Sequence, residues 1–212
     1  WPSSQAGAQA KTYDGLNRDQ AVAALSGGYD TRGNLTNDGT RAFTYDVENR
    51  LLTAALPGVS ASLSYDPLGR LSSYTVNGTA TQFLYLGPDL VGEYDGAWNL
   101  LRRYAHGDGV DEPLVWYEGA GTAGRRYLHA DRQGSIIAWS DNTGAVQATY
   151  AYGPYGEPQG WSGSRFRYTG QIALPELQLY HYKARVYDPI AGRFLQTDPI
   201  GYKDGHIGRA PL

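Results

Sequence analysis

The feature that most constrains this chain is a Tyr-Asp dyad that occurs five times, each time followed four residues after the Asp by Arg or Asn. Successive Tyr residues of the dyads are 16, 16, 20 and 29 residues apart, and in four of the units a Leu follows the Arg or Asn. A unit that recurs in this way indicates a repeat architecture. The five units are Tyr13-Asp14 with Arg18, Tyr29-Asp30 with Asn34, Tyr45-Asp46 with Arg50, Tyr65-Asp66 with Arg70, and Tyr94-Asp95 with Asn99.

Each unit predicts a strand, a turn and a second strand. The Tyr would close a half-buried strand, and the Asp side chain can accept hydrogen bonds from backbone N–H groups two or three residues later. Gly33, Asn49 and Gly69 tolerate the positive φ that ends such a turn, and the Arg that follows can pair with the Asp. We therefore expect structural turn residues that each close one hairpin of a growing antiparallel sheet, namely Asp14, Asp30, Asp46, Asp66 and Asp95.

Composition agrees with a sheet that has one apolar and one wet face. The chain has 18 Tyr against 4 Phe and 5 Trp, and a Tyr ring can pack while its hydroxyl reaches water or a backbone group. Its 28 Gly and 11 Pro supply many turns. At 212 residues the chain could form one large β domain or two smaller ones. We predict an all-β fold.

Charge and cysteine content argue against several function classes. The net charge is −3 with both signs interspersed, so a nucleic-acid partner has little support. The absence of Cys excludes disulfides, thiolate metal sites and thiol nucleophiles. No apolar run approaches the ~20 residues that span a bilayer. The first residue is Trp1 rather than Met, from which we expect a piece of a longer protein.

Hairpin signals continue beyond the dyads. Asn77-Gly78 favours a type I′ turn between alternating apolar residues, and we expect consecutive hairpins from residue 29 to residue 152. The stretch Asp19 to Leu25 could form a short helical turn, although its surroundings favour strand and turn. Two longer hairpins are predicted across the loops Gly119–Gly124 and Asp141–Gly144.

The second half of the chain is dense in motifs that resemble the core domain of bacterial RHS proteins, and the dyads resemble the YD repeats of the same family. The resemblance covers about residues 13 to 205. The motifs are Tyr127-Leu-His-Ala-Asp131-Arg-Gln-Gly134, Tyr152-Gly-Pro-Tyr-Gly156, Tyr168-Thr-Gly-Gln171, Leu179-Tyr-His-Tyr-Lys-Ala-Arg185-Val-Tyr-Asp-Pro189, Gly192-Arg-Phe194 and Asp198-Pro-Ile-Gly201.

The family resemblance implies a hollow β-shell of spiralling hairpins, capped at one end by the core domain. Such a shell holds a variable C-terminal polypeptide, commonly a toxin, which an aspartic autoprotease activity in the core releases. The expected partners are that toxin or neighbouring segments of the shell, and the parent protein is expected to be exported or at the cell surface. On this basis we divide the chain into a frayed edge (1–12), YD-repeat hairpins (13–119), a core domain (120–205) and an atypical short tail (206–212).

The resemblance also assigns candidate catalytic residues. Asp198 matches the family's catalytic aspartate and Arg185 an arginine of the same motif, with Arg193 and Asp188 in support. Aspartic proteolysis needs two carboxylates, one to activate water and one to protonate the scissile carbonyl. The family's second Asp-Pro segment does not follow Lys203 here. We therefore expect at most a latent autoprotease, and Asp188 and Asp198 also fit simple Asp-Pro turns.

Metal and sugar binding are the remaining alternatives. The four His residues, His106, His129, His181 and His206, do not suggest a three-ligand cluster, and the acidic stretch 106–112 reads as a solvated turn, so we expect no metal and no cofactor. An aromatic-rich β-repeat could instead be a carbohydrate-binding or adhesion module. The irregular spacing of Trp98, Trp116, Trp139 and Trp161 favours the shell interpretation over this one.

Overall fold

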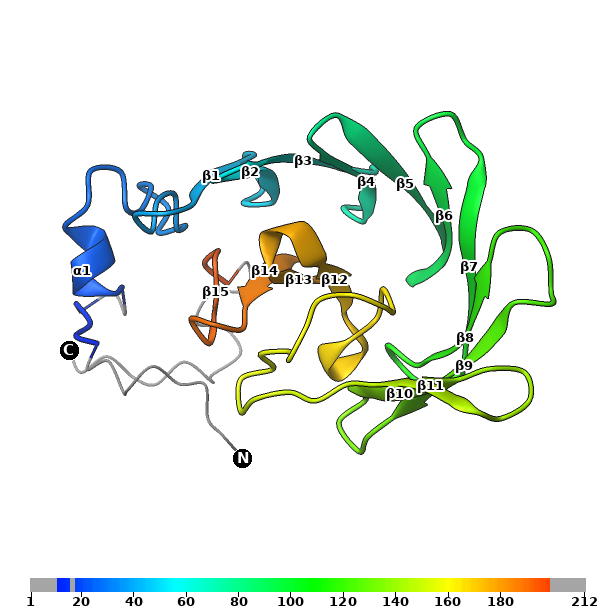
Figure 1. Ribbon diagram of the computed structural model, residues 1–212. Coiled ribbons are helices and arrows are strands. Elements are labelled where there is room, and N and C mark those ends of the chain that lie inside the picture. The colour runs from blue at the N-terminus through cyan, green and yellow to red at the C-terminus, as the bar shows by residue number, and fades with distance from the viewer. Residues whose placement is uncertain (1–10, 16–17, 199–212) are drawn as a thin grey trace.

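The computed structural model describes residues 11–15 and 18–198, which are almost entirely β-structure (Figure 1). Most of the strands belong to one antiparallel sheet of eleven, which we call the wall. Its strands are β1 (Ala42–Tyr45), β2 (Leu51–Leu56), β3 (Val59–Tyr65), β4 (Leu71–Val76), β5 (Thr79–Leu86), β6 (Asp89–Asp95), β7 (Leu100–His106), β8 (Pro113–Glu118), β9 (Arg125–Ala130), β10 (Ile136–Ser140) and β11 (Val146–Thr149).

Residues 150–198 form what we call the inner segment. It contains a four-stranded antiparallel sheet and two short 3-10 helices, Tyr168–Gly170 and Pro175–Leu177. The strands are β12 (Ile172–Leu174), β13 (Leu179–Tyr182), β14 (Arg185–Asp188) and β15 (Arg193–Phe194). In Figure 1 the wall sweeps through an arc from β1 to β11, and β12 to β15 lie inside that arc.

The wall pairs its strands in the order of the sequence, β1 next to β2 and so on to β11, and it does not close on itself. This confirms the predicted curved sheet of consecutive hairpins. The β4–β5 turn shows the local cause: Asn77 and Gly78 both have positive φ, 48° and 85°, as a two-residue type I′ hairpin requires. The hairpins predicted across Gly119–Gly124 and Asp141–Gly144 are also present, as β8–β9 and β10–β11.

The beginning of the chain differs from the prediction in two ways. The sheet starts at Ala42 rather than at residue 29, and the first two dyads make only isolated bridges, Tyr13 with Asp19 and Tyr29 with Leu35. The strand-and-turn interpretation of residues 19–25 was wrong, because Gln20–Ala23 form a short helix, α1. Asp19 caps this helix by accepting a hydrogen bond from the backbone N–H of Ala21 at 3.0 Å.

The core lies between the inner face of the wall and the inner segment. Wall residues that point inward are almost fully buried, and they meet apolar side chains of β12 to β15. The wall contributes Phe43, Leu51, Leu63, Leu71, Phe83, Leu90, Trp116 and Ile136, and the inner segment contributes Phe166, Leu174, Leu177, Leu179, Val186 and Leu195. The inner segment therefore covers the apolar face that a bare curved sheet would expose.

The proposed domain boundary near residue 120 falls in the loop between β8 and β9, and both strands belong to the wall. The division therefore stays a prediction. Most of the frayed edge predicted for 1–12, and all of the tail predicted for 206–212, lie outside the described residues.

Candidate functional site

The predicted catalytic pair lies at one end of the inner sheet. Arg185 opens β14 and Asp198 follows β15, and Nη2 of Arg185 is 2.8 Å from Oδ2 of Asp198. The guanidinium also lies 3.9 Å from the ring centre of Phe194, so the arginine is fixed on two sides. The fold thus brings together two residues that are thirteen positions apart, and Asp198 keeps an exposed fraction of 16%.

The two supporting residues have different surroundings. Asp188 is fully buried, with Oδ2 paired to Arg41, the residue before β1, and Oδ1 accepting hydrogen bonds from the backbone N–H groups of Ile190 (2.9 Å) and Ala191 (3.1 Å). Both carboxylate oxygens of Asp188 are therefore engaged in holding a turn and joining the inner segment to the start of the wall. Arg193 donates from Nη1 to the hydroxyl of Tyr29 at 3.1 Å, which joins β15 to the second dyad.

The dyad aspartates all lie in one kind of turn. In the fourth unit, Asp66 accepts hydrogen bonds from the backbone N–H groups of Leu68 and Arg70, each at 2.9 Å, and Nε of Arg70 donates to its second oxygen at 2.7 Å. Asp46 repeats all three contacts with Glu48 and Arg50. Asp30 and Asp95 make the same two backbone contacts, and their second oxygen accepts from the side-chain amide of Asn34 or Asn99 instead of from an Arg. Asp14 accepts from the backbone N–H and from Nε of Arg18.

These hydrogen bonds decide the charge state of the carboxylates. Partial burial alone would raise the pKa of Asp66, but the bonds from Arg70 and Leu68 outweigh it and hold the pKa below its ordinary value. For Asp95 the largest contribution is the side-chain hydrogen bond from Asn99, which also lowers the pKa. The carboxylates of Asp46, Asp66 and Asp95 are thus arranged as ionised acceptors inside their own turns.

A second set of contacts links neighbouring repeats. The hydroxyl of Tyr65 donates to the carbonyl oxygen of Leu51 at 2.9 Å, and the Tyr45 hydroxyl reaches Leu35 in the same way. Burial raises the pKa of Tyr65, so this hydroxyl stays a donor. In the other direction, the guanidinium of Arg50 lies 5.0 Å from the ring centre of Tyr65. We call this exchange of a tyrosine hydroxyl and an arginine between adjacent repeats the repeat clasp.

Two further turns of the same kind lie outside the dyads, and one of them, at Asp141, closes a hairpin that the sequence predicted. Asp131 accepts from the backbone of Gln133 and Ser135, and Asp141 from the backbone of Thr143 and Ala145. Neither Asp follows a Tyr, and neither has Arg or Asn four residues later. The sequence signal that the two turns share is a Gly three residues after the Asp, Gly134 and Gly144, where φ is positive at 81° and 86°.

A buried polar cluster joins the wall to the inner segment. Glu93 of β6, 1% exposed, faces Arg165, whose Nε and Nη2 lie 3.0 and 2.8 Å from the two carboxylate oxygens. The Tyr104 hydroxyl donates to the same carboxylate, and Arg102 lies 3.6 Å away. Desolvation would raise the pKa of Glu93, but the positive charge of Arg165 outweighs it and lowers the pKa. The sequence analysis did not single out either residue.

Within residues 11–15 and 18–198, no group of three or more His, Asp or Glu side chains is arranged to hold a metal ion. In the same part of the chain, no helix is long and apolar enough to cross a bilayer.

Sequence comparisons point to one family. The family model "Teneurin YD-shell" matches residues 3–206. Among curated proteins, tRNA nuclease WapA of Bacillus subtilis (strain 168) is 34% identical over 205 residues, which are 92% of this chain and 9% of that protein. Salivary gland surface protein 1 of Aedes aegypti is 49% identical over 61 residues, 26% of this chain and 2% of that protein. The chain thus spans about a tenth or less of the length of these relatives.

Solved structures share the fold. The crystal structure of TcdB2-TccC3-TEV covers 86% of this chain with a TM-score of 0.67 and 19% identity, and this chain covers 10% of that one. TcdB2-TccC3 without its hypervariable C-terminal region covers 84% of this chain, which covers 10% of it, with a TM-score of 0.64 and 20% identity. With its dyad turns, its open sheet of consecutive hairpins and the match over residues 3–206, the chain belongs to the YD-shell family of RHS/YD-repeat proteins.

Proposed function

We propose that this chain is a wall segment of a shell that encloses a C-terminal polypeptide, commonly a toxin in such proteins, and that Arg185 and Asp198 belong to the site that releases it. The observation that carries the proposal is the shape of the wall: an open, curved sheet of eleven strands with an apolar inner face. A sheet that curves without closing can be continued by further hairpins at its edges. Its natural partners are therefore neighbouring segments of the same shell.

The relatives agree with a role in toxin delivery by a longer protein. The name of the Bacillus subtilis relative describes a tRNA nuclease, and this chain matches only 9% of it. We infer that this segment contributes the container of such a protein rather than its nuclease activity. For the parent protein we propose export or display at the cell surface, where a carried toxin would act.

Enclosure can be tested in the parent protein with a protease. A polypeptide held inside the shell should resist proteinase K, and it should become sensitive when the wall is opened by Arg165→Met, which removes the partner of buried Glu93. Arg32→Met, at a largely exposed arginine, is the matched control and should leave protection intact. Rapid cleavage of the carried polypeptide in the unaltered protein, at the rate seen in Arg165→Met, would contradict the enclosure.

Release is a separate proposal with its own test. Nη2 of Arg185 holds the carboxylate of Asp198 at 2.8 Å, and this carboxylate is the one that could activate water. The second carboxylate of the motif, Asp188, has both oxygens engaged. We therefore expect the 212-residue chain to keep its mass when incubated from pH 4 to pH 8 and weighed by intact mass spectrometry. A time-dependent cut that Asp198→Asn abolishes would overturn this expectation.

The role of Asp198 can be tested by adding a tail of the kind that the family carries, with a second Asp-Pro segment. This extended chain should cut itself, and Asp198→Asn should prevent the cut. Asp141→Asn, at a partly exposed turn aspartate, is the matched control and should not prevent the cut. If Asp198→Asn leaves cleavage of the extended chain unchanged, the assignment of this residue fails while the enclosure proposal stands.

A carbohydrate-binding module has less support. Trp116 and Trp139 pack against each other with ring centres 5.8 Å apart, and Trp161 packs against Tyr180 at 5.0 Å. Among the described tryptophans, Trp98 is the large exposed one, with an exposed fraction of 61%. A single exposed ring does not provide the row of stacking platforms that a sugar chain would use.

A further inference from the structure

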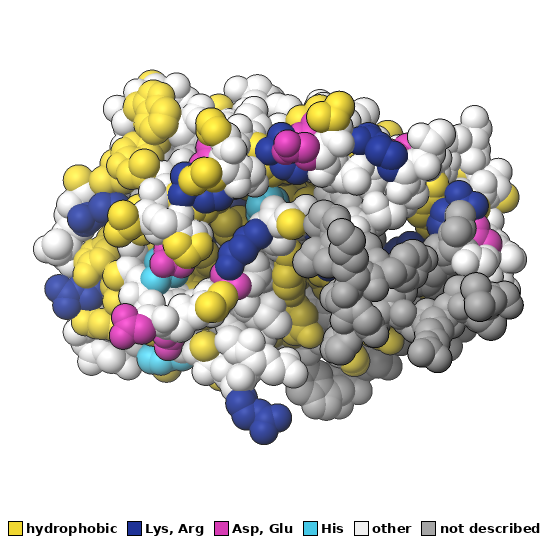
Figure 2. Space-filling view, turned by 180° about the vertical axis from the view of Figure 1, so that it is seen from behind, with side chains coloured by type: hydrophobic (Ala, Val, Ile, Leu, Met, Phe, Trp, Pro, Cys, Tyr) yellow, Lys and Arg dark blue, Asp and Glu magenta, His cyan; other side chains and the backbone are white. Residues whose placement is uncertain are grey.

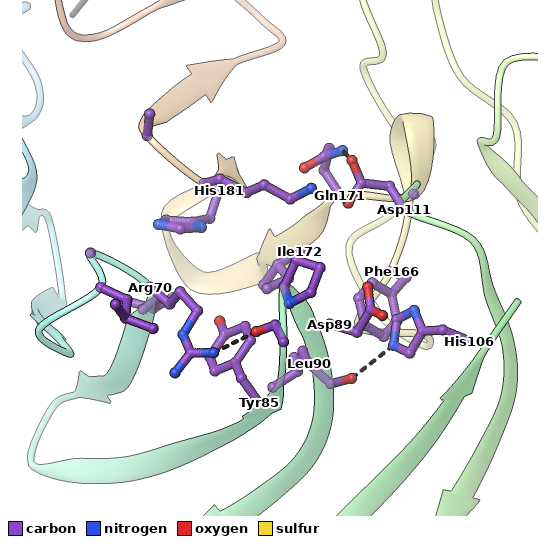
Figure 3. A pocket seen from close by; sticks show the side chains of 18 of the residues that line it. Arg70, Tyr85, Asp89, Leu90, His106, Asp111, Phe166, Gln171, Ile172 and His181 are labelled. Atoms are coloured by element: carbon purple, nitrogen blue, oxygen red, sulfur yellow. Dashed lines mark hydrogen bonds and ion pairs between the residues drawn. The ribbon is translucent and has the colours of Figure 1, made fainter. Parts of the chain in front are cut away.

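A cavity of about 600 Å³ lies between the turns of the wall and the inner segment (Figure 3). Its volume is in the range of small-molecule binding pockets, roughly 300 to 1,000 Å³. Much of its lining is apolar, with contributions from Leu71, Leu90, Phe166 and Ile172 and from the ring of Tyr85. Figure 2 shows basic and acidic side chains spread over the visible face, with hydrophobic side chains between them.

The cations in the lining already have partners. Arg70 is held by Asp66 at 2.6 Å, and Arg50 is held by Asp46 at 2.6 Å and by Glu48 at 2.9 Å. Lys183 is held by Asp111 at 2.7 Å, across the gap between the inner segment and the β7–β8 loop. None of these three side chains is left to attract an anion into the cavity.

Asp89 is different. It is the first residue of β6, it lines the cavity, and it is only half-buried. Within the described part of the chain, its carboxylate has neither an ion pair nor a hydrogen bond. In Figure 3 it lies between the Tyr85 side and the His106 side of the cavity. A carboxylate without a counter-charge at an apolar cavity gives that cavity a preference for positive charge.

We propose that this cavity is a binding site for an organic cation with an apolar body, such as an arylalkylammonium ion or the side chain of a Lys or Arg residue. The ammonium or guanidinium group would pair with Asp89, and the apolar body would lie among Leu71, Phe166 and Ile172. Burial lowers the pKa of His181 to about 4, so that this neighbour adds no positive charge at neutral pH.

Three probes of the same shape test the charge preference. Isothermal titration calorimetry of the purified full chain at pH 7 would compare 2-phenylethylammonium with neutral 2-phenylethanol and anionic 3-phenylpropionate. We expect the cation to bind about tenfold more tightly than the alcohol, since a partly desolvated charge pair contributes on the order of one such factor. The acid should bind most weakly. A cation that binds no better than the alcohol, or no binding of any probe, would overturn the proposal.

Two variants locate the site. Asp89→Asn keeps the shape and removes the charge, so it should abolish the preference for the cation over the alcohol, whereas Asp108→Asn makes the same change in net charge outside the cavity and should leave it intact. If Asp89→Asn unfolds the chain, as circular dichroism would reveal, Ala184→Phe replaces it. A Phe at this exposed position in the lining should block all three probes. If folded Asp89→Asn kept the preference for the cation, the cation would bind outside this cavity. Where Ala184→Phe is used instead, unchanged binding of the probes would lead to the same conclusion.

The source of the cation is decided by a second pair of probes. A capped Phe-Lys dipeptide and its norleucine counterpart differ only in the ammonium group. Preference for the Lys peptide would show that the cavity admits a side chain of a polypeptide, and binding of the free amine alone would assign the site to a small molecule. These outcomes do not depend on the enclosure of a toxin, because the titrations use the chain alone.

Discussion

The aspartates of the dyad turns find partners close by in the sequence, whereas two buried ion pairs join the inner segment to residues far away. Asp46 and Asp66 bond to residues two and four positions later, inside their own turns. Arg165 reaches Glu93 across 72 residues, and Asp188 reaches Arg41 across 147. The wall is therefore a series of self-contained turns, and the inner segment is held by long-range contacts that form only when the whole chain has folded.

The largest expected effect lies in the inner segment. Arg165→Met leaves the carboxylate of Glu93 buried without its main counter-charge, which should lower the free energy of unfolding by about 3 to 5 kcal/mol. Urea denaturation followed by tryptophan fluorescence measures it. The double variant Arg165→Met with Glu93→Gln should recover much of the loss. If the single variant unfolds at the same urea concentration as the unaltered chain, the buried pair does not hold the inner segment to the wall.

Acid should act on the inner segment before it acts on the turns. Burial lowers the pKa of His181 from 6.5 to about 4. In the unfolded chain this histidine is therefore protonated near pH 6.5, whereas in the folded chain it is protonated only near pH 4. Stability from this group is complete above pH 6.5 and is lost as the pH falls toward 4, by about 3 kcal/mol at most. Urea midpoints between pH 7 and pH 4 measure it.

The control for the acid effect is a second histidine. His181→Leu should flatten the dependence between pH 6.5 and pH 4, while His129→Gln, at an exposed position, should leave it as it is. An equal slope in the unaltered chain and in His181→Leu would show that another group is responsible.

A turn of the wall should matter less than a contact of the inner segment. Asp66→Ala removes the acceptor for the backbone N–H groups of Leu68 and Arg70 and for Nε of Arg70. We expect a loss of about 1 kcal/mol, as for a lost helix cap or turn hydrogen bond. Thermal unfolding measures it, with Asp108→Ala as the control at a loop aspartate. A loss as large as that of Arg165→Met would erase the contrast between the two regions.

The smallest effect should be a gain. Trp98 has a positive φ of 63° at the position that Gly33, Asn49 and Gly69 occupy in other repeats, and a bulky residue is strained there. Trp98→Asn should raise stability by about 0.5 kcal/mol, because relief of the strain exceeds the lost ring contact with Tyr94 at 5.6 Å. Trp98→Phe is the control and should change little. Destabilisation by Asn would mean that the ring contact dominates.

What could be predicted from the sequence follows the same contrast. The turns around Asp46, Asp66 and Asp95 depend on residues within four positions of each other, so the dyads indicated them directly. The turn at Asp131 depends on the same local geometry but lacks the Tyr, so the dyads did not indicate it. The helix at Gln20–Ala23 was rejected in favour of the repeat pattern, although its cap, Asp19, was visible in the sequence.

The contacts of the inner segment could not be predicted in this way. No residue near Glu93 in the sequence indicates that Arg165 is its partner. The two side chains meet only because residues 150–198 fold back inside the wall. Arg185 and Asp198 were named through a family motif rather than through any local rule, and their 2.8 Å contact depends on the pairing of β14 with β15. Asp89, which lines the cavity, carried no sequence signal at all.

The repeat clasp has a consequence for how such a wall can change length over generations. Tyr65 reaches back to Leu51 and Arg50 reaches forward to Tyr65, so each clasp involves only two neighbouring repeats. If one whole unit were duplicated or deleted, each Tyr hydroxyl at the new junction would again face the Leu carbonyl of a neighbouring unit. The same hydrogen bond could therefore form there. A cut within a unit would leave a tyrosine without its carbonyl. We therefore expect such walls to change in length during evolution by the duplication or deletion of complete repeats.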